Sequence, residues 1–149
     1  MPEKILIINN DPDMVTLLSM LIREKTPYKT EVTNNPLEAI EMVKQGGFSV
    51  VIAEMKMPVM DGLEILEAVK HIAEDIPVII LSAYGDVESA LEAMHKGAFD
   101  YLTKPFRKEQ ILFAIENALD SVRLKKENGM LTERLRTLET ERLNGWMVA

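Results

Sequence analysis

The chain lacks cysteine altogether, and its apolar runs are short. Without a thiol it can form neither a disulfide framework nor a thiolate metal site, and this composition suits a reducing compartment. The runs SVVIA and IPVIIL fall far below the roughly 20 residues that a membrane span requires, and the start MPEKILIINN has too short an apolar run for a signal peptide. We therefore expect a cytoplasmic protein.

Positive charge is scarce in most of the chain, whose net charge is −7. The first 120 residues contain 11 basic and 20 acidic residues, whereas residues 121–149 contain six basic and four acidic ones. Contacts to nucleic-acid phosphates need a concentrated positive surface, so this balance opposes direct nucleic-acid binding. The 47% hydrophobic composition is ample for a buried core.

Short apolar runs alternate with amphipathic stretches over the first 120 residues. The runs are continuously apolar, which is typical of strands buried on both faces, and the stretches between them have helical periodicity. Strands are predicted over 4–8, 29–32, 48–53, 77–81 and 100–103, and helices over about 11–25, 36–45, 63–73, 87–96 and from about 107. Five such pairs predict a doubly wound α/β fold with a five-stranded parallel sheet between two layers of helices.

Ligands of such sheets bind beyond the carboxyl ends of the strands. The residues at these ends are Asn9, Asn10, Asp11, Glu54, Ser82, Ala83 and Lys104. Acidic residues after the first and third strands, a hydroxyl after the fourth and a lysine after the fifth suit phosphoryl transfer to a carboxylate, assisted by magnesium. The ordered set carries this interpretation, since no single residue in it is diagnostic.

Residues 4 to about 120 resemble the receiver domain of bacterial response regulators. The matching segments are KILIINNDPD, VVIAEMKMPVMDGLEIL and PVIILSAYGDVESALEAMHKGAFDYLTKPF. The resemblance implies a flavodoxin-like sheet of order 2-1-3-4-5, with a receiver domain over 1–120 and a helical extension over 121–149. The last segment and the charged helix after it most resemble receivers of the nitrogen-regulator class of enhancer-binding activators.

The phosphorylation site that the resemblance implies is altered in this chain. Asn9 and Asn10 stand where the family usually has two acidic residues, and Glu54 stands where it has the phosphoacceptor aspartate. The family's magnesium ligands are one of the acidic pair, the acceptor and the carbonyl two residues beyond it, here that of Lys56. Asparagine lacks the charge of aspartate, and Asp11 is not a secure substitute, so we expect no magnesium site and no other cofactor.

The resemblance also assigns three further positions: Ser82 as the phosphate-binding hydroxyl, Lys104 as the phosphate-binding lysine and Tyr101 as the switch aromatic. Glu54 then has three interpretations. It can be a permanent partial mimic of the phosphorylated state, a drifted residue in a rigid docking block, or a residual phosphoacceptor whose extra methylene misplaces the carboxylate. The asparagine pair can equally be turn and capping residues.

A helix from about 107 to 143 is interrupted only by Gly129, which costs about 1 kcal/mol in a helix. A coiled-coil spacing follows residue 120, with alternating steps of four and three residues through Leu124, Asn128, Leu131, Leu135, Leu138 and Arg142. Asn128 lies where asparagine favours parallel dimers, whereas the core face upstream is out of phase with this seam. The alternative is a charged linker helix without stable pairing.

The sequence thus predicts an interaction module of a two-component system rather than an enzyme. It would dimerise or dock through its last two helices and the extension, with protein partners that include a second copy, a histidine kinase or an output domain, and no membrane. The alternative is a working phosphoacceptor receiver that regulates transcription through a missing ATPase or DNA-binding domain. The chain would then be part of a longer protein, whereas a stand-alone adaptor would end at 144–149.

Overall fold

The computed structural model describes residues 3–83 and 85–148, with side chains described up to residue 140. Strands and helices alternate along the chain as predicted. In order they are β1 (Lys4–Ile8), α1 (Pro12–Lys25), β2 (Lys29–Thr33), α2 (Pro36–Gln45), β3 (Val50–Glu54), α3 (Gly62–Ile72), β4 (Val78–Ser82), α4 (Val87–His95), β5 (Asp100–Thr103) and α5 (Lys108–Val148).

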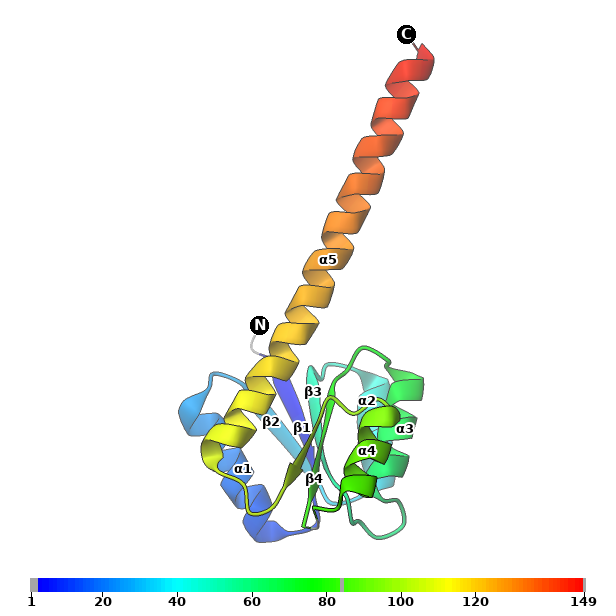
Figure 1. The fold of residues 1–149 in the computed structure, drawn as a ribbon. Helices are drawn as coiled ribbons and strands as arrows, with labels where there is room; N and C mark the ends of the chain where they lie inside the picture. The colour runs from blue at the N-terminus through cyan, green and yellow to red at the C-terminus, as the bar shows by residue number, and fades with distance from the viewer. Residues whose placement is uncertain (1–2, 84, 149) are drawn as a thin grey trace.

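The five strands form one parallel sheet of order β2-β1-β3-β4-β5, which confirms the predicted topology. Helices α1 and α5 cover one face of the sheet, and α2, α3 and α4 cover the other (Figure 1). Each face holds its own cluster of buried apolar side chains. The sheet therefore lies between two helical layers, as continuously apolar strands require.

The central strands explain why the sequence shows runs and not alternation. All five residues of β3 and all five of β4 are buried. By contrast, the edge strand β2 (KTEVT) keeps most of its residues exposed, and its charged side chains discourage edge-to-edge pairing with other chains. Several predicted boundaries were wrong by one or two residues. In particular, β3 begins at Val50 and not at Phe48, and it ends with Glu54, which was predicted to follow the strand.

Polar side chains begin the helices on the carboxyl side of the sheet. Asp11 caps α1 and Asn35 caps α2. Asp61 forms a capping box with Glu64 at the start of α3. These caps satisfy backbone N–H groups that the first turn of a helix leaves without partners.

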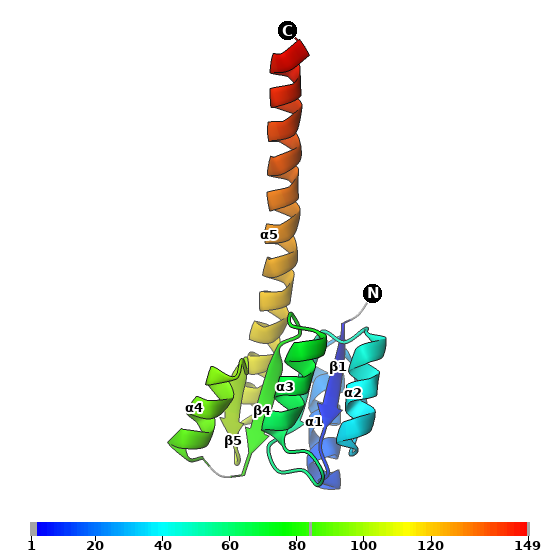
Figure 2. The ribbon, with the colours of Figure 1, turned by 90° about the vertical axis from the view of Figure 1, so that its right-hand side faces the viewer.

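Helix α5 is continuous over 41 residues and projects far beyond the globule (Figures 1 and 2). The predicted continuity is confirmed, and the helix extends beyond the predicted end near 143. It leaves the globule at the amino ends of the strands, opposite the edge where their carboxyl ends lie. The side chains of Arg142 and of the 144–149 tail lie outside those described. None of the described helices is both long and apolar enough to cross a membrane.

The point where α5 leaves the globule is held by a polar network. Arg123 donates to the Glu3 carboxylate at 2.7 and 3.2 Å and to the Tyr28 hydroxyl at 3.3 Å. The Tyr28 hydroxyl donates to Glu116 at 2.7 Å. The carboxylate of Glu3 raises the pKa of Arg123, whereas burial raises the pKa of Tyr28. The first turn of the extension is therefore tied to the start of the sheet.

Gly129→Ala should strengthen the extension. A Cβ at Gly129 meets no atom within 4 Å, so the substitution removes only the backbone entropy cost of glycine, about 1 kcal/mol. Slower amide hydrogen exchange over residues 121–140 would measure the gain. Gly46→Ala is the matched control, because Gly46 has φ +84° and alanine there should destabilise the protein. Unchanged exchange in Gly129→Ala would contradict the prediction.

Candidate functional site

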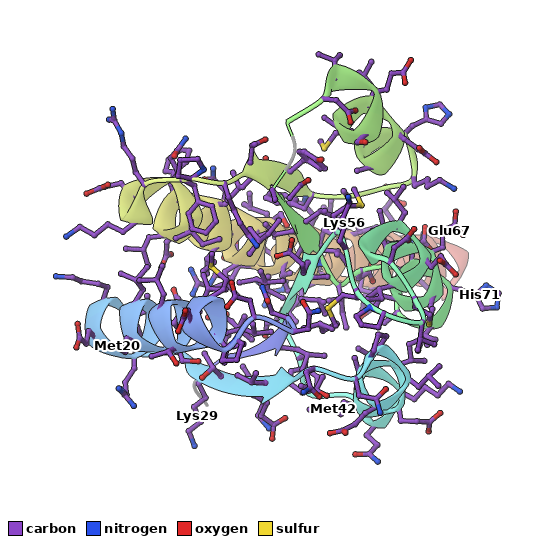
Figure 3. The ribbon with its side chains drawn as sticks, turned by 90° about the horizontal axis from the view of Figure 1, so that it is seen from below. Met20, Lys29, Met42, Lys56, Glu67 and His71 are labelled. Carbon is purple, nitrogen blue, oxygen red and sulfur yellow. The ribbon has the colours of Figure 1, made fainter. Side chains whose placement is uncertain are left out.

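The candidate site lies at the carboxyl edge of the sheet, where four neighbouring strands end. Asn9 follows β1, Glu54 ends β3, Ser82 ends β4 and Lys104 follows β5. Figure 3 looks onto this end of the molecule. Asn9, Glu54 and Ser82 are buried, with exposed fractions of 1%, 5% and 3%. The topology thus gathers polar residues that are far apart in the sequence at one edge of an apolar sheet.

Glu54 is the centre of the site. The Lys104 Nζ donates to Glu54 Oε2 at 2.5 Å, and the Asn9 Nδ2 donates to the same oxygen at 3.2 Å. The Glu54 side chain is 7% exposed and that of Lys104 20%. A buried carboxylate is tolerated only when it is paired and hydrogen-bonded, and both conditions hold here.

Both polar atoms of the Asn9 side-chain amide form hydrogen bonds. Its Oδ1 accepts a hydrogen bond from the Asp11 backbone N–H at 2.8 Å, while its Nδ2 reaches Glu54. Asp11 in turn accepts from the Asp13 backbone N–H at 3.0 Å. Asn9 therefore acts both as a turn residue before α1, as the sequence suggested, and as a partner of Glu54, which the sequence did not indicate.

The other residues predicted for the site lie on β4 and β5 and in the loops after β1 and β3. The Ser82 carbonyl accepts from the Lys104 backbone N–H at 2.7 Å, which brings the ends of β4 and β5 together. Tyr101 lies on β5, partly buried against the core cluster beneath α2, α3 and α4. Asn10 is exposed, as is Lys56 in the loop after β3 (Figure 3). Of the residues predicted at the end of the first strand, Asn10 and Asp11 thus lie outside the buried cluster, and Asn9 lies in it.

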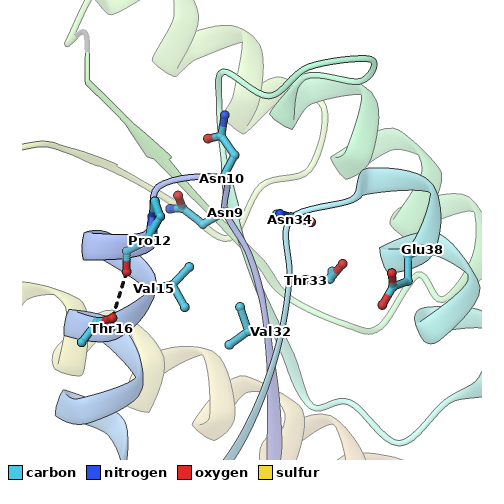
Figure 4. A pocket seen from close by; sticks show the side chains of 9 residues that line it. All are labelled: Asn9, Asn10, Pro12, Val15, Thr16, Val32, Thr33, Asn34 and Glu38. Atoms are coloured by element: carbon cyan, nitrogen blue, oxygen red, sulfur yellow. Dashed lines mark hydrogen bonds between the residues drawn. The ribbon is translucent and has the colours of Figure 1, made fainter.

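A cleft of about 480 Å³ opens beside Asn9 and Asn10, between α1 and the end of β2 (Figure 4). Its lining consists of Asn9, Asn10, Pro12, Val15, Thr16, Val32, Thr33, Asn34 and Glu38. These groups are amides, hydroxyls, apolar side chains and one carboxylate. A phosphate group would find no cation among them, so the anion-binding part of the site is the Lys104 side.

Gly62 holds the β3–α3 loop close to Glu54, a contact that the sequence did not reveal. The Gly62 N–H donates to the Met55 carbonyl at 2.7 Å. A Cβ on Gly62 would lie 2.8 Å from both the Glu54 carbonyl oxygen and the Met55 Cα. The start of α3 therefore packs against the end of β3 as closely as only glycine allows.

Gly62→Ala should destabilise the protein by about 1–3 kcal/mol, the usual cost of overpacking, because the obstructing atoms belong to the backbone. A lower midpoint of urea unfolding at unchanged slope would measure this loss. Gly129→Ala provides the comparison, since its added Cβ is unobstructed. An unchanged midpoint in Gly62→Ala would mean that the loop moves without cost.

An apolar stripe lies on α4, next to the site. Val87, Leu91 and Met94 are 72%, 64% and 47% exposed and follow helical spacing on one face. Asp86 caps this helix. Its carboxylate accepts a hydrogen bond from the Ser89 backbone N–H, and this hydrogen bond lowers the pKa of Asp86. An exposed apolar face of this kind marks an interaction surface.

Metal-binding geometry is not apparent among the described side chains. Within that part of the chain, no three histidine, cysteine, aspartate or glutamate residues lie close enough together to hold a metal ion. Glu54 is the one carboxylate buried at the site, and it already faces a lysine.

Comparison with known proteins agrees with this fold. A family model, the response regulator receiver domain, matches residues 5–116. The transcriptional regulatory protein ZraR of Klebsiella oxytoca is 36% identical over 122 residues, which cover 82% of this chain and 27% of that protein. The chain thus spans about a quarter of the length of this relative.

Two solved structures show the same architecture. The crystal structure of a receiver domain protein from Clostridium thermocellum has a TM-score of 0.77 at 31% identity, and covers 82% of this chain and 98% of that one. The solution structure of the beryllofluoride-activated NtrC4 receiver domain dimer has a TM-score of 0.76 at 28% identity, and covers 80% and 98% of the two chains.

Proposed function

The chain belongs to the response-regulator receiver family of two-component signalling, and from this premise we propose that it is a pseudo-receiver, a cytoplasmic module that binds other proteins and does not cycle phosphate. It would not be an enzyme. One observation carries the proposal: the carboxylate at the phosphoacceptor position already forms a buried ion pair with Lys104 and a hydrogen bond with Asn9.

The donor set at the strand ends does not suit magnesium. Magnesium requires near-ideal octahedral geometry and is usually held by one or two carboxylates. Here the candidates are the amides of Asn9 and Asn10, the carboxylate of Glu54, the backbone carbonyl of Lys56 and the carboxylate of Asp11, which already caps α1. The amide oxygen of Asn9 accepts from a backbone N–H, and the negative charge of Glu54 faces an ammonium group. We infer that the site is not a magnesium site, and no step of the proposed function depends on a metal.

The position of the carboxylate also opposes phosphoryl transfer. Glutamate carries its carboxylate one methylene farther from the strand than aspartate does. When a reacting group is misplaced by about 1 Å, the rate of a reaction that depends on alignment can fall on the order of 100-fold. Without a metal to neutralise the phosphoryl oxygens, the loss of acceptor activity should be complete on any signalling timescale.

The same reach lets Glu54 act as a fixed anion. It holds Lys104 permanently, as a phosphoryl oxygen would, but it carries one negative charge where a phosphoryl group carries about two. Its bias toward the active conformation should therefore be incomplete. Tyr101, the switch aromatic that the receiver resemblance implies, is partly buried against the core cluster on the strand that precedes Lys104.

Proteins are the partners that these surfaces favour. The exposed apolar stripe of α4 and the exposed leucines of α5 offer contact area, and the acidic globule opposes nucleic acid. A second copy of the chain, a histidine kinase or an output domain fits this requirement. The NtrC4 receiver, which is similar in fold, is a dimer in its activated form.

The proposal is tested by incubating the protein with acetyl phosphate and magnesium and measuring its intact mass. We expect no phosphate adduct. A stoichiometric, magnesium-dependent adduct would overturn the proposal and support the alternative, a working receiver of a larger transcription regulator such as ZraR, of which this chain matches about a quarter.

Glu54→Gln tests whether the anion holds the switch. Removal of the charge should release Lys104 and shift Tyr101 toward solvent, since glutamine keeps the size but not the ion pair. The NMR resonances of β5 and of the Tyr101 ring would report this shift. Glu41→Gln, which removes a carboxylate from a surface pair with Lys44, is the control. If the chemical shifts of β5 and of the Tyr101 ring are the same in Glu54→Gln as in the natural chain, the charge of Glu54 does not control the position of Tyr101.

A further inference from the structure

The cleft between α1 and the end of β2 has a lining that the proposed function does not use. Its volume of about 480 Å³ lies in the range of small-molecule sites. Val15 of α1 and Val32 of β2 supply apolar surface, and Asn10, Asn34 and Glu38 supply polar groups around it (Figure 4). Val32 is 39% exposed, so a small ligand with an apolar part can reach this surface.

Three side chains of the lining have acceptor oxygens that the chain itself does not use. Within the described part of the chain, the side chains of Asn10, Asn34 and Glu38 take part in no hydrogen bond or ion pair. Asn9 and Thr33, by contrast, already use their polar side-chain atoms in hydrogen bonds. The acceptors left for a ligand are therefore two amide oxygens and one carboxylate.

The charges around the cleft favour a cation. The basic residues of the four surrounding elements all lie at the opposite ends of those elements, and they are Lys4, Arg23, Lys25, Lys29 and Lys44. The first turns of α1 and α2, which border the cleft, contain Asp13 and Glu38 instead. This separation gives the cleft a negative potential.

The two helix N-termini at the cleft do not favour an anion. The Asp11 carboxylate caps α1 by accepting from the Asp13 N–H, and the Asn35 side chain caps α2 by accepting from the Leu37 and Glu38 N–H groups. The chain's own acceptors thus already satisfy backbone donors that could otherwise hold an anion.

An alkylammonium ion suits these groups better than a metal ion does. An ammonium group has three donors, and the three residues with unused acceptors can satisfy them. Magnesium instead needs a near-ideal octahedral shell, usually anchored by one or two carboxylates. The aliphatic chain of the ion would cover Val15 and Val32, and burial of each methylene is favourable.

We propose that this cleft binds a small aliphatic amine in its protonated form, with the ammonium group on the Glu38 carboxylate and the amide oxygens of Asn10 and Asn34. The site would make the chain a sensor of a small organic cation in addition to a protein-binding module.

Asn9 connects the cleft to the candidate site. Its buried side chain lines the cleft and donates to Glu54, whose carboxylate also accepts from Lys104. Occupation of the cleft should therefore change the environment of the Glu54–Lys104 pair. Amine binding itself does not rest on the proposed function, whereas this coupling rests on it, because the pair is the fixed switch of the pseudo-receiver.

The probe for the test is n-butylammonium, titrated into the full chain while amide resonances are followed by NMR. A dissociation constant on the order of 1 mM is expected for a ligand this small. Saturable shifts should appear at the end of β2 and at the starts of α1 and α2. n-Butanol and butyrate, which have the same chain without the positive charge, should bind at least about tenfold more weakly.

Two variants separate the cleft from the acidic surface in general. Glu38→Gln should weaken butylammonium binding about tenfold, because it removes the charged acceptor. Glu41→Gln, on the same helix but in a surface pair with Lys44, should leave the affinity unchanged. Both glutamates are exposed, so both variants should keep the urea midpoint of the natural chain. Methylammonium should bind several-fold more weakly than butylammonium, since it covers less apolar surface.

The coupling is read from Lys104, whose side-chain resonances should shift with the same midpoint as those of the cleft. Unchanged Lys104 resonances in a filled cleft would overturn the coupling.

Three results would overturn the amine site. They are equal binding of butyrate or butanol, full affinity in Glu38→Gln, and shifts that spread over the acidic surface without saturating. Tighter binding of Nα-acetyl-lysine methylamide than of butylammonium would place the ammonium group on a partner protein, and would overturn the assignment to a free amine. None of these results bears on whether Glu54 accepts phosphate, which the intact-mass measurement decides separately.

Discussion

The variant Asn9→Asp/Asn10→Asp/Glu54→Asp should become phosphorylated by acetyl phosphate in the presence of magnesium, whereas the natural chain should not. The substitutions supply two carboxylates after β1 and shorten the acceptor by one methylene. Ser82 and Lys104 already stand at the ends of the neighbouring strands, so the rest of the receiver set is in place. The rate of phosphorylation should rise more than about 100-fold over that of the natural chain, because correct alignment of the acceptor alone contributes about that factor and metal binding adds to it.

Intact mass over time measures the rate of phosphorylation. Two further variants separate the effect of magnesium binding from the effect of the shorter acceptor. Asn9→Asp/Asn10→Asp should bind magnesium without taking phosphate, since Glu54 remains too long. Glu54→Asp alone should do neither. In the triple variant, the aspartate at position 9 would lie against the acceptor, where Asn9 and Glu54 are now 3.2 Å apart. Without metal it should therefore be less stable than the natural chain, and magnesium should restore its stability.

A triple variant that binds magnesium but takes no phosphate would mean that the edge residues are not arranged as in working receivers. A phosphorylated natural chain would end the pseudo-receiver proposal outright.

The second large effect concerns Lys104. Lys104→Met should destabilise the protein by about 3 kcal/mol, because it leaves the buried Glu54 carboxylate without its counter-charge. For a domain of ordinary stability this is a substantial share of the total. Urea unfolding followed by circular dichroism would measure it as a lower midpoint at unchanged slope.

A double-mutant cycle separates the ion pair from other effects of the substitution. Glu54→Gln/Lys104→Met should recover most of the loss, since no uncompensated charge remains and glutamine can still accept from Asn9. Lys96→Met, which removes the lysine of an exposed pair with Glu67, should have a much smaller effect. Equal losses of unfolding free energy for Lys104→Met and Lys96→Met would show that the buried ion pair contributes no more to stability than the exposed pair.

Much of this protein followed from the sequence because the signals are local. Continuous apolar runs in β3 and β4 indicated buried parallel strands. The uninterrupted helical pattern indicated one long α5. Since the carboxyl ends of parallel strands share an edge, the sequence also determined that Asn9, Glu54, Ser82 and Lys104 would meet there.

The tertiary structure decided contacts between elements that the sequence did not indicate. The sequence indicated that Asn9 can be a turn residue, and only the packing of strands 45 residues apart shows that it is also a partner of Glu54. The contact of Gly62 with the end of β3 was decided in the same way. The physical reason is that periodicity reports which face of an element is apolar, whereas a shared carboxylate oxygen or a missing Cβ depends on distances between elements, which exist only after the sheet has assembled.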